Sequence, residues 1–249
     1  MSKRLEGRIA VVSGGGAGIG KGIAHVLAKE GADIAVATRS SFDEVKALVE
    51  AEGHRFFGAT VDVSDESQVN AFAGQVREAL GPVDIIMNNA AISSHGAIED
   101  TSFEYWQRLF SINVHGNFLF TRAFVEGVKR SPAGRIICMA STAPLVSQLG
   151  KFVTYMTSKA AVNGFISALA TDLGEYGVTV NGVAPSVIRT PSTEQHLNEE
   201  WFAMHIDKQN IKRQQTSEDI GNMVAYLASD AASFITGQVM IVDGGLTRR

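Results

Sequence analysis

Short apolar runs alternate with longer amphipathic segments along most of the chain. Seven runs rich in Val, Ile and Ala predict strands at residues 8–13, 33–38, 56–61, 83–87, 135–139, 178–183 and 239–242. Helical patterns lie between most of them, at residues 18–30, 43–52, 66–80, 103–129, 154–173 and 218–227. Nearly continuous apolar strands joined by crossover helices are typical of a parallel sheet buried on both faces. We therefore expect an α/β fold, a single Rossmann-type doubly wound domain over residues 1–249, with a seven-stranded parallel sheet and helices on both faces.

One long stretch interrupts this alternation. Residues 186–216 are more polar than the rest and carry Trp201, Phe202, Met204 and His205. A connection of this length inside a compact domain usually has a function. We expect a substrate-binding loop or lid here.

Composition narrows the class of protein. The chain is 45% hydrophobic and 19% charged, with a net charge of -4, and shows no cluster of Lys and Arg. We therefore expect neither a nucleic-acid nor a membrane partner. The single cysteine, Cys138, cannot form an internal disulfide, and no apolar run has the length of a membrane span. Together these features predict a soluble, cytoplasmic protein, and the spacing of the histidines predicts no metal site.

A glycine-rich loop follows the first predicted strand directly. Glycines at a strand-to-helix turn let backbone N–H groups approach a pyrophosphate at the helix N-terminus. The spacing is Gly-x3-Gly-x-Gly, and a flexible turn would have the same composition, but its place in a strand–helix–strand unit favours a dinucleotide site. The expected contacts are Gly14, Gly16, Gly18, Ile19 and Gly20.

The residues after the second and third strands bear on the choice of cofactor. Thr38, Arg39 and Ser40 supply one guanidinium and hydroxyls but no carboxylate. Since an acid here would bind the ribose of NAD and an Arg accommodates the 2′-phosphate of NADP, we prefer NADP and keep NAD as an alternative. Asp62, next to Val63, is expected to accept a hydrogen bond from the adenine amino group, or else to cap a turn.

Acid–base chemistry is indicated by Tyr155 and Lys159, which share one face of a predicted helix, and by Ser141 after a strand. A free tyrosine has a pKa of about 10, and lowering it by about 3 units requires about 4 kcal/mol. We expect the Lys159 ammonium and the positive charge of the oxidised cofactor to lower this pKa. Ser141 would hold the substrate oxygen against the Tyr155 hydroxyl. Taken alone, the tyrosine–lysine pair is also a common surface pair.

These motifs together resemble those of the short-chain dehydrogenase/reductase family, over essentially all 249 residues. The matching positions are Gly14-x3-Gly18-Ile19-Gly20, Asn88-Asn89-Ala90, Asn113, Ser141, Tyr155-x3-Lys159, and Pro185 with Thr190. The chain departs from the family at Ser13, Ala91 and Ser186, and none of the three removes a reacting group.

The resemblance implies roles for several of these residues. Asn113 would hold a water that links Lys159 to solvent, and Lys159 would bind the nicotinamide ribose. Asn89 would lie near the adenine ribose. The Ile188 backbone and the Thr190 hydroxyl would contact the nicotinamide carboxamide. The resemblance also implies a homotetramer, packed through the helices predicted at residues 103–129 and 154–173.

The sequence indicates less about the substrate than about the cofactor. Residues 184–190 and 234–238 resemble bacterial secondary-alcohol dehydrogenases of the 1-phenylethanol type. We therefore expect a secondary alcohol or ketone, cyclic or aromatic, in a mainly apolar cleft. The expected contacts are His95, Val146, Phe152, Val187, Trp201, Phe202 and His205. Core packing would also explain the aromatic ones, and His95 is expected at the rim of the pocket.

Two other functions stay open. A 3-oxoacyl thioester reductase would carry a basic docking surface, which the sequence does not reveal. A non-catalytic dinucleotide-binding sensor or scaffold would lack Tyr155, Lys159 or Ser141, and all three are present. The favoured hypothesis is an oxidoreductase that moves a hydride between the nicotinamide cofactor and its substrate, with Tyr155 as general acid/base.

Overall fold

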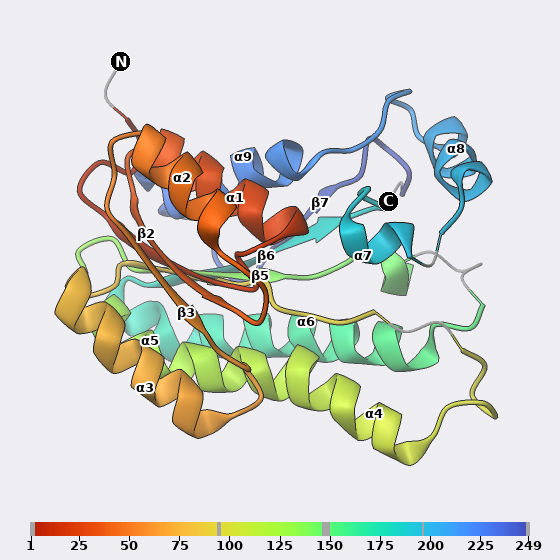
Figure 1. The fold of residues 1–249 in the computed structure, drawn as a ribbon, viewed down its shortest axis with the longest axis horizontal. Coiled ribbons are helices and arrows are strands. Elements are labelled where there is room, and N and C mark those ends of the chain that lie inside the picture. The colour runs from red at the N-terminus through yellow and green to blue at the C-terminus, as the bar shows by residue number, and fades with distance from the viewer. Residues whose placement is uncertain (1–2, 94–95, 146–149, 196, 248–249) are drawn as a thin grey trace.

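A computed structural model describes residues 3–93, 96–145, 150–195 and 197–247 (Figure 1). Within them lies the predicted seven-stranded sheet, which is parallel throughout and has the order β3-β2-β1-β4-β5-β6-β7. The strands are β1 Ile9–Ser13, β2 Asp33–Thr38, β3 Phe56–Thr60, β4 Ile85–Asn88, β5 Arg135–Met139, β6 Thr179–Pro185 and β7 Val239–Val242. The predicted fold class is confirmed, with strand ends shifted by one or two residues.

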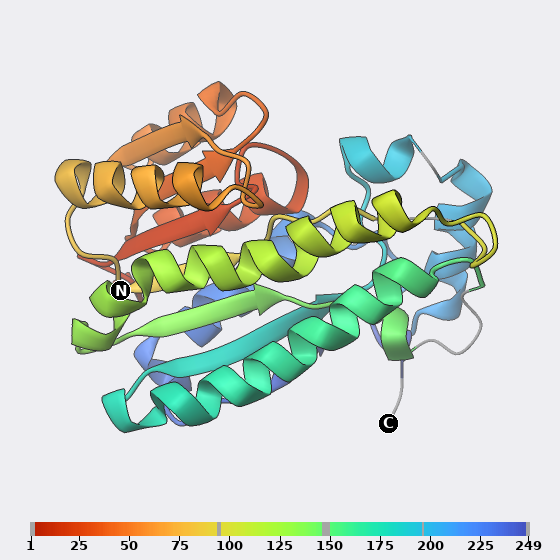
Figure 2. The same ribbon diagram turned by 90° about the horizontal axis from the view of Figure 1, so that it is seen from below.

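Helices cover both faces of the sheet (Figures 1 and 2). One face packs against α1 (Gly18–Lys29), α2 (Asp43–Ala51) and α9 (Ser217–Ala228). The other packs against α3 (Glu66–Ala79), α5 (Gly116–Arg130) and α6 (Val153–Leu173). Successive residues of a strand point to opposite faces, so Ala10 and Val12 of β1 join the first core, whereas Ile9 and Val11 join the second.

The helix predicted at residues 103–129 differs from the expectation in its middle. It comprises α4 (Phe103–Phe110), a π-helical segment (Ser111–His115) and α5, so the prediction of one uniform helix is wrong there. Such π turns insert one extra residue per turn and frequently occur at functional sites. Here the insertion carries the buried Asn113, one of the residues that the family resemblance selected.

The strand order determines where a ligand can bind. β1 pairs with β2 on one side and with β4 on the other, so the chain reverses direction across the sheet at this point. In open α/β sheets, the crevice at the carboxyl ends of the strands beside such a reversal is the usual binding site.

Residues 186–195 and 197–216 lie beyond the carboxyl ends of the strands (Figure 1). They form α7 (Pro191–Glu194) and α8 (Glu199–Lys208), followed by an extended stretch. The backbone N–H groups of Asn210 and Ile211 donate to the Gly244 carbonyl, which joins this region to the C-terminal segment. No helix within the described ranges is long and apolar enough to cross a membrane.

Candidate active site

A cavity of about 1030 Å3 opens at the carboxyl ends of the strands. Its wall includes the glycine-rich loop, the residues that follow β2 to β6, and parts of α6, α7 and α8. Every residue predicted to bind the cofactor lines it except Gly16, which lines an adjoining hollow of about 500 Å3. Ser141, Tyr155 and Lys159 line the same cavity.

The glycine-rich loop has the geometry that a pyrophosphate requires. Gly14 and Gly18 have φ angles of 65° and 52°, which disfavour residues with a side chain. A Cβ on Gly20 would lie 2.2 Å from the Gly14 carbonyl oxygen, so the turn closes only with glycine. No side chain in the described part of the chain caps the start of α1 at Ala17. The first N–H groups of α1 therefore fit a phosphate group.

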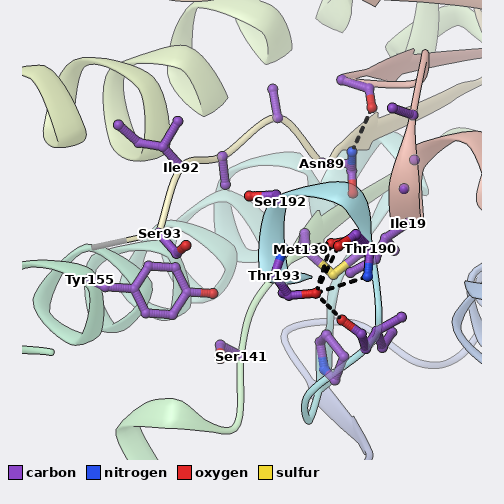
Figure 3. Close-up of a pocket in the computed structure, with 18 of the residues that line it drawn as sticks. Ile19, Asn89, Ile92, Ser93, Met139, Ser141, Tyr155, Thr190, Ser192 and Thr193 are labelled. Atoms are coloured by element: carbon purple, nitrogen blue, oxygen red, sulfur yellow. Dashed lines mark hydrogen bonds between the residues drawn. The ribbon is translucent and has the colours of Figure 1, made fainter. Parts of the chain in front are cut away.

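Ser13 and Asn89 hold this loop in place through hydrogen bonds. The Ser13 hydroxyl accepts hydrogen bonds from the backbone N–H groups of Asn89 and Ala90, at 2.9 and 3.1 Å. The Asn89 Nδ2 donates to the Ser13 carbonyl at 3.0 Å and to the Gly14 carbonyl at 3.1 Å, and Figure 3 shows the second of these bonds. Asn89 thus reaches the cavity wall while its amide nitrogen holds the loop, and the Ser13 hydroxyl fixes the backbone that follows β4.

Asp62 is engaged by the protein itself. Its carboxylate accepts hydrogen bonds from the Ser64 N–H and hydroxyl, at 2.9 and 2.6 Å, and from Arg108 at 2.9 Å. Burial raises its pKa, but the hydrogen bonds from Ser64 and Arg108 outweigh burial and bring the pKa to about 2. The Asp62 side chain therefore caps its own turn, the alternative that the sequence left open, while it still lines the cavity.

Arg39 is held much more loosely than Arg108. Its nearest acidic partner is Asp62, with a 3.9 Å separation between Nη1 and Oδ2, and 58% of its side chain is exposed. Beside it, the hydroxyls of Thr38 and Ser40 lie 2.9 Å apart. One loosely bound guanidinium and two hydroxyls can together bind a phosphate group.

The Tyr155 hydroxyl points into the cavity, with Ser93 and Ser141 nearby (Figure 3). Burial raises the pKa of Tyr155, and hydrogen bonding to Ser141 opposes this shift. The predicted lowering of this pKa is thus wrong for the protein groups alone. Burial is the cause of the raised pKa. The Lys159 Nζ, the group expected to lower this pKa, donates to the Met139 carbonyl at 2.7 Å and lies 5.7 Å from the centre of the Tyr155 ring.

Lys159 is itself strongly affected by its surroundings. Only 2% of the residue is exposed, and burial lowers its pKa to about 8. A lysine ammonium can donate three hydrogen bonds, and the Met139 carbonyl accepts one. Two donors remain for other groups in the cavity, such as ribose hydroxyls.

Asn113 connects the π-helical segment to its surroundings. Its side chain exchanges two hydrogen bonds with the backbone of Ile92, both 2.9 Å long, and donates to the Ser158 hydroxyl at 3.1 Å. The Asn113 carbonyl accepts a hydrogen bond from the Asn117 Nδ2 at 2.6 Å. Sequence reasoning missed Asn117, although two asparagines four residues apart on one helix face were a visible signal.

The expected substrate contacts divide into three groups. Phe152, Val187, Trp201 and His205 line the cavity, and Phe152 packs edge-on against Tyr155. Phe202 is 2% exposed and lies under the Arg189 guanidinium instead of in the cavity wall. His95 and Val146 lie outside the described residues.

Several lining residues were not foreseen, among them Ile92, Tyr105, Leu197 and Leu246. The Tyr105 hydroxyl donates to the Ser93 carbonyl at 3.2 Å. Leu246 comes from the C-terminal segment, and no local sequence pattern pairs that segment with residues 186–216.

Thr190 and Ile188 form a small network at the start of α7 (Figure 3). The Thr190 hydroxyl accepts from the Thr193 N–H, and the Thr193 hydroxyl donates to the Ile188 carbonyl at 2.8 Å. These bonds hold residues 188–193 against the cavity, which both Ile188 and Thr190 line.

Comparison with known proteins gives the class of this one. A family model described as enoyl-(acyl carrier protein) reductase matches residues 14–247. The chain is 34% identical to the (2S)-[(R)-hydroxy(phenyl)methyl]succinyl-CoA dehydrogenase subunit BbsD of Thauera aromatica, over 97% of each protein.

Two solved structures have the same fold. A short-chain dehydrogenase/reductase from Serratia marcescens has a TM-score of 0.91 and 30% identity, over 98% of this chain and 100% of that one. A blue fluorescent protein from a metagenomic library, in complex with NADPH, has a TM-score of 0.89 and 33% identity, over the same shares of the two chains.

The chain belongs to the short-chain dehydrogenase/reductase family. It is therefore a nicotinamide-dependent oxidoreductase, and enzymes of this family act on small-molecule alcohols or ketones.

Proposed function

We propose that this oxidoreductase transfers a hydride between NADP(H) and a secondary alcohol or ketone that carries a ring, with Tyr155 as general acid/base. The observation that carries the proposal is the shared cavity. It brings the glycine-rich loop, Arg39, Ser141 and Tyr155 together at the carboxyl ends of the strands.

In the reducing direction, the bound cofactor supplies the hydride that the carbonyl carbon receives. The Tyr155 hydroxyl gives its proton to the carbonyl oxygen, and the Ser141 hydroxyl donates a hydrogen bond to the same oxygen. Because burial raises the pKa of Tyr155, the phenol carries its proton before the reaction begins. The buried Lys159 ammonium then stabilises the phenolate, and Asn113 holds the Ile92 backbone and α6 in place around it.

The preference for NADP rests on Arg39. Because Arg108 already satisfies Asp62, Arg39 is free to turn toward a 2′-phosphate, where Thr38 and Ser40 add hydroxyl donors. No acidic residue between positions 38 and 42 would repel that phosphate. The relative solved with NADPH is consistent with this preference.

The preference for a ring rests on the apolar and aromatic part of the wall, formed by Ile92, Phe152, Val187, Trp201 and Leu246. The relative from Thauera aromatica is named for an alcohol whose carbon bears a phenyl ring, which supports an aryl substrate. Its name also contains a CoA thioester, and the matching family model is named for an acyl carrier protein substrate. A 3-oxoacyl thioester reductase is therefore the second candidate.

We propose further that residues 186–216 act as the substrate lid, since α7, α8 and the preceding segment contribute to the cavity wall. A homotetramer would cover Phe103, Phe118 and Val153, apolar side chains of α4, α5 and α6 that are exposed in the single chain.

The test follows nicotinamide absorbance with NADPH and, separately, NADH, using cyclic and aryl ketones and one 3-oxoacyl thioester. We expect rapid NADPH oxidation with aryl or cyclic ketones. Faster reduction of the thioester would favour the second candidate, and preference for NADH would refute the cofactor assignment. Tight NADPH binding without turnover in either direction would indicate a non-catalytic sensor.

A further inference from the structure

Helix α8 presents two stacked rings to the cavity. Trp201 and His205 are one turn apart, their ring centres are 3.9 Å apart, and the angle between their planes is 25°. Both line the cavity, whereas Phe202 between them points into the protein.

The helix that carries these rings is anchored at its first turn. The Asn198 side chain caps the Trp201 N–H at 3.0 Å. Arg189 makes two hydrogen bonds to Glu199, at 2.6 and 2.8 Å, and stacks on Phe202 with 4.3 Å between its guanidinium carbon and the ring centre. These contacts hold one face of α8 inward, and therefore hold Trp201 and His205 toward the cavity.

A hydrogen bond determines which nitrogen of His205 carries the proton. Nδ1 lies 2.9 Å from the Trp201 carbonyl oxygen, and a carbonyl oxygen can only accept. Nδ1 is therefore the donor, and Nε2 of the neutral ring keeps its lone pair. Burial lowers the pKa of His205, which favours this neutral form at pH 7. No described residue donates a hydrogen bond to Nε2.

The two ends of the cavity thus offer opposite hydrogen-bonding chemistry. At the reacting end, Ser141 and Tyr155 offer hydroxyl protons to a carbonyl oxygen. At α8, His205 offers an acceptor beside the face of an indole ring. The wall of the same cavity also includes apolar side chains, among them Phe152, Val187 and Leu246. A ligand that satisfies both ends carries a carbonyl at one end and a hydrogen-bond donor on the part that reaches α8.

We propose that His205 determines substrate specificity by accepting a hydrogen bond from a hydroxyl group of the substrate. The preferred substrates are ketones with a ring that bears a free hydroxyl remote from the reacting carbonyl. This inference rests on the proposed function and narrows its substrate class. A bound ring without the hydroxyl would displace water from Nε2 without replacing its hydrogen bond, and sites built to bind a hydroxyl discriminate strongly against analogues that lack it.

The experiment compares kcat/KM for hydroxyacetophenones with that for the corresponding methylacetophenones, at each ring position, with NADPH. In the unaltered enzyme we expect at least one hydroxyl compound to be preferred by about tenfold or more. In His205→Phe, which keeps an aromatic ring at the stack, the preference should fall to about one, with the methyl compound within about threefold of its original rate. His205→Gln, which retains an acceptor, should recover part of the preference. Met204→Leu, at the neighbouring exposed position, should leave it unchanged.

Binding measurements separate this inference from the proposed function. Calorimetric titration of the complex with NADP+ measures affinity for the same pairs of compounds, whether or not turnover occurs. Tighter binding of a hydroxyl compound that is lost in His205→Phe supports the inference even if no ketone is reduced. Equal preference in the unaltered enzyme and in His205→Phe, by rate and by affinity, would overturn it. Reduction of ketones without a hydroxyl preference would leave the proposed function standing and refute only the role of His205.

Discussion

The two halves of the cavity are built in different ways. The cofactor half uses backbone groups and short loops that directly follow β1, β2, β4 and β6. The substrate half uses side chains from Tyr105 of α4, Phe152 before α6, Trp201 and His205 of α8, and Leu246 near the C-terminus. A pyrophosphate is the same group in every dinucleotide cofactor. It can be bound by backbone N–H groups, whose position follows from strand and helix geometry. A variable substrate requires side chains, and these meet only through tertiary packing.

Because the cofactor half is built from closely packed backbone, we expect it to be sensitive to any added side-chain atom. A Cβ at Gly20 would clash with backbone, whereas one at Gly74 of α3 would meet nothing within 4 Å. The substrate half contains half-buried side chains, including Trp201 and His205 of α8. We expect substitutions there to alter selectivity more than stability.

The largest effect on turnover should come from loss of the Tyr155 hydroxyl. Tyr155→Phe removes the acid–base hydroxyl, and general acid–base catalysis typically contributes 10²–10⁴-fold, so kcat should fall by about three orders of magnitude. The affinity for NADPH, measured by fluorescence titration, should change by less than about threefold. Tyr105→Phe is the control, because it removes only the hydrogen bond to the Ser93 carbonyl and should retain most of the activity. Near-normal turnover in Tyr155→Phe would refute the assigned role.

Gly20→Ala tests the backbone-built half. The new Cβ would be 2.2 Å from the Gly14 oxygen and 2.5 Å from the Asn89 Nδ2, so the loop must open. We expect NADPH affinity to fall by about a hundredfold and the free energy of unfolding by about 1–3 kcal/mol.

Gly74→Ala is the matched control for this change. It should leave affinity unchanged and raise the free energy of unfolding by about 0.5–1 kcal/mol, because alanine is favoured over glycine inside a helix. Equal affinities in the two variants would show that the loop tolerates a side chain.

Arg39→Ala tests the proposed contact between the Arg39 guanidinium and the 2′-phosphate of the cofactor. Loss of hydrogen bonds to a charged phosphate costs about 1.5–3 kcal/mol, so KM for NADPH should rise by about 10–100-fold while KM for NADH changes little. Lys46→Ala, at an exposed position of α2, is the control. A similar change for both cofactors in Arg39→Ala would exclude binding of the 2′-phosphate.

The smallest effect is a pH dependence of stability. Burial lowers the pKa of Lys159 to about 8 from an ordinary value of 10.5, so between these values the unfolded chain binds more protons than the folded one. The free energy of unfolding should therefore rise with pH in this window, by at most about 1.4 kcal/mol per pH unit. Lys159→Met should lack this component, as judged from urea unfolding of the cofactor-free protein between pH 8 and pH 10. The same slope in both proteins would mean that Lys159 is not the group responsible.

The fold and the cofactor half could be predicted from local patterns. The seven strands are confirmed to within two residues, and the glycine-rich loop, Thr38, Arg39 and Ser40 all border the cavity or its adjoining hollow. Because each of these features follows a strand directly, its location depends on nearby sequence alone. The π turn at Asn113 escaped prediction, because helical periodicity does not reveal one extra residue in a turn.

The substrate half could be predicted only in part. Trp201, Phe202 and His205 are close together in the sequence, yet Trp201 and His205 face the cavity whereas Phe202 packs beneath Arg189. The sequence shows that these residues are aromatic, but the direction of each depends on how α8 packs on the rest of the protein. Asp62 is a similar case, since its partner Arg108 comes from α4, 46 residues later.

The sequence by itself therefore determined the alternation of strands and helices, the turn that only glycine permits, and the placement of Tyr155 and Lys159 on one helix face. Backbone geometry and side-chain periodicity act over a few residues, so these properties follow from local sequence. The tertiary structure alone decided that Lys159 bonds to the Met139 carbonyl, that Asn117 holds the Asn113 carbonyl, and that Leu246 joins the cavity wall. Each of those contacts depends on how complete elements pack, because burial and long-range contacts set the direction and pKa of the groups involved.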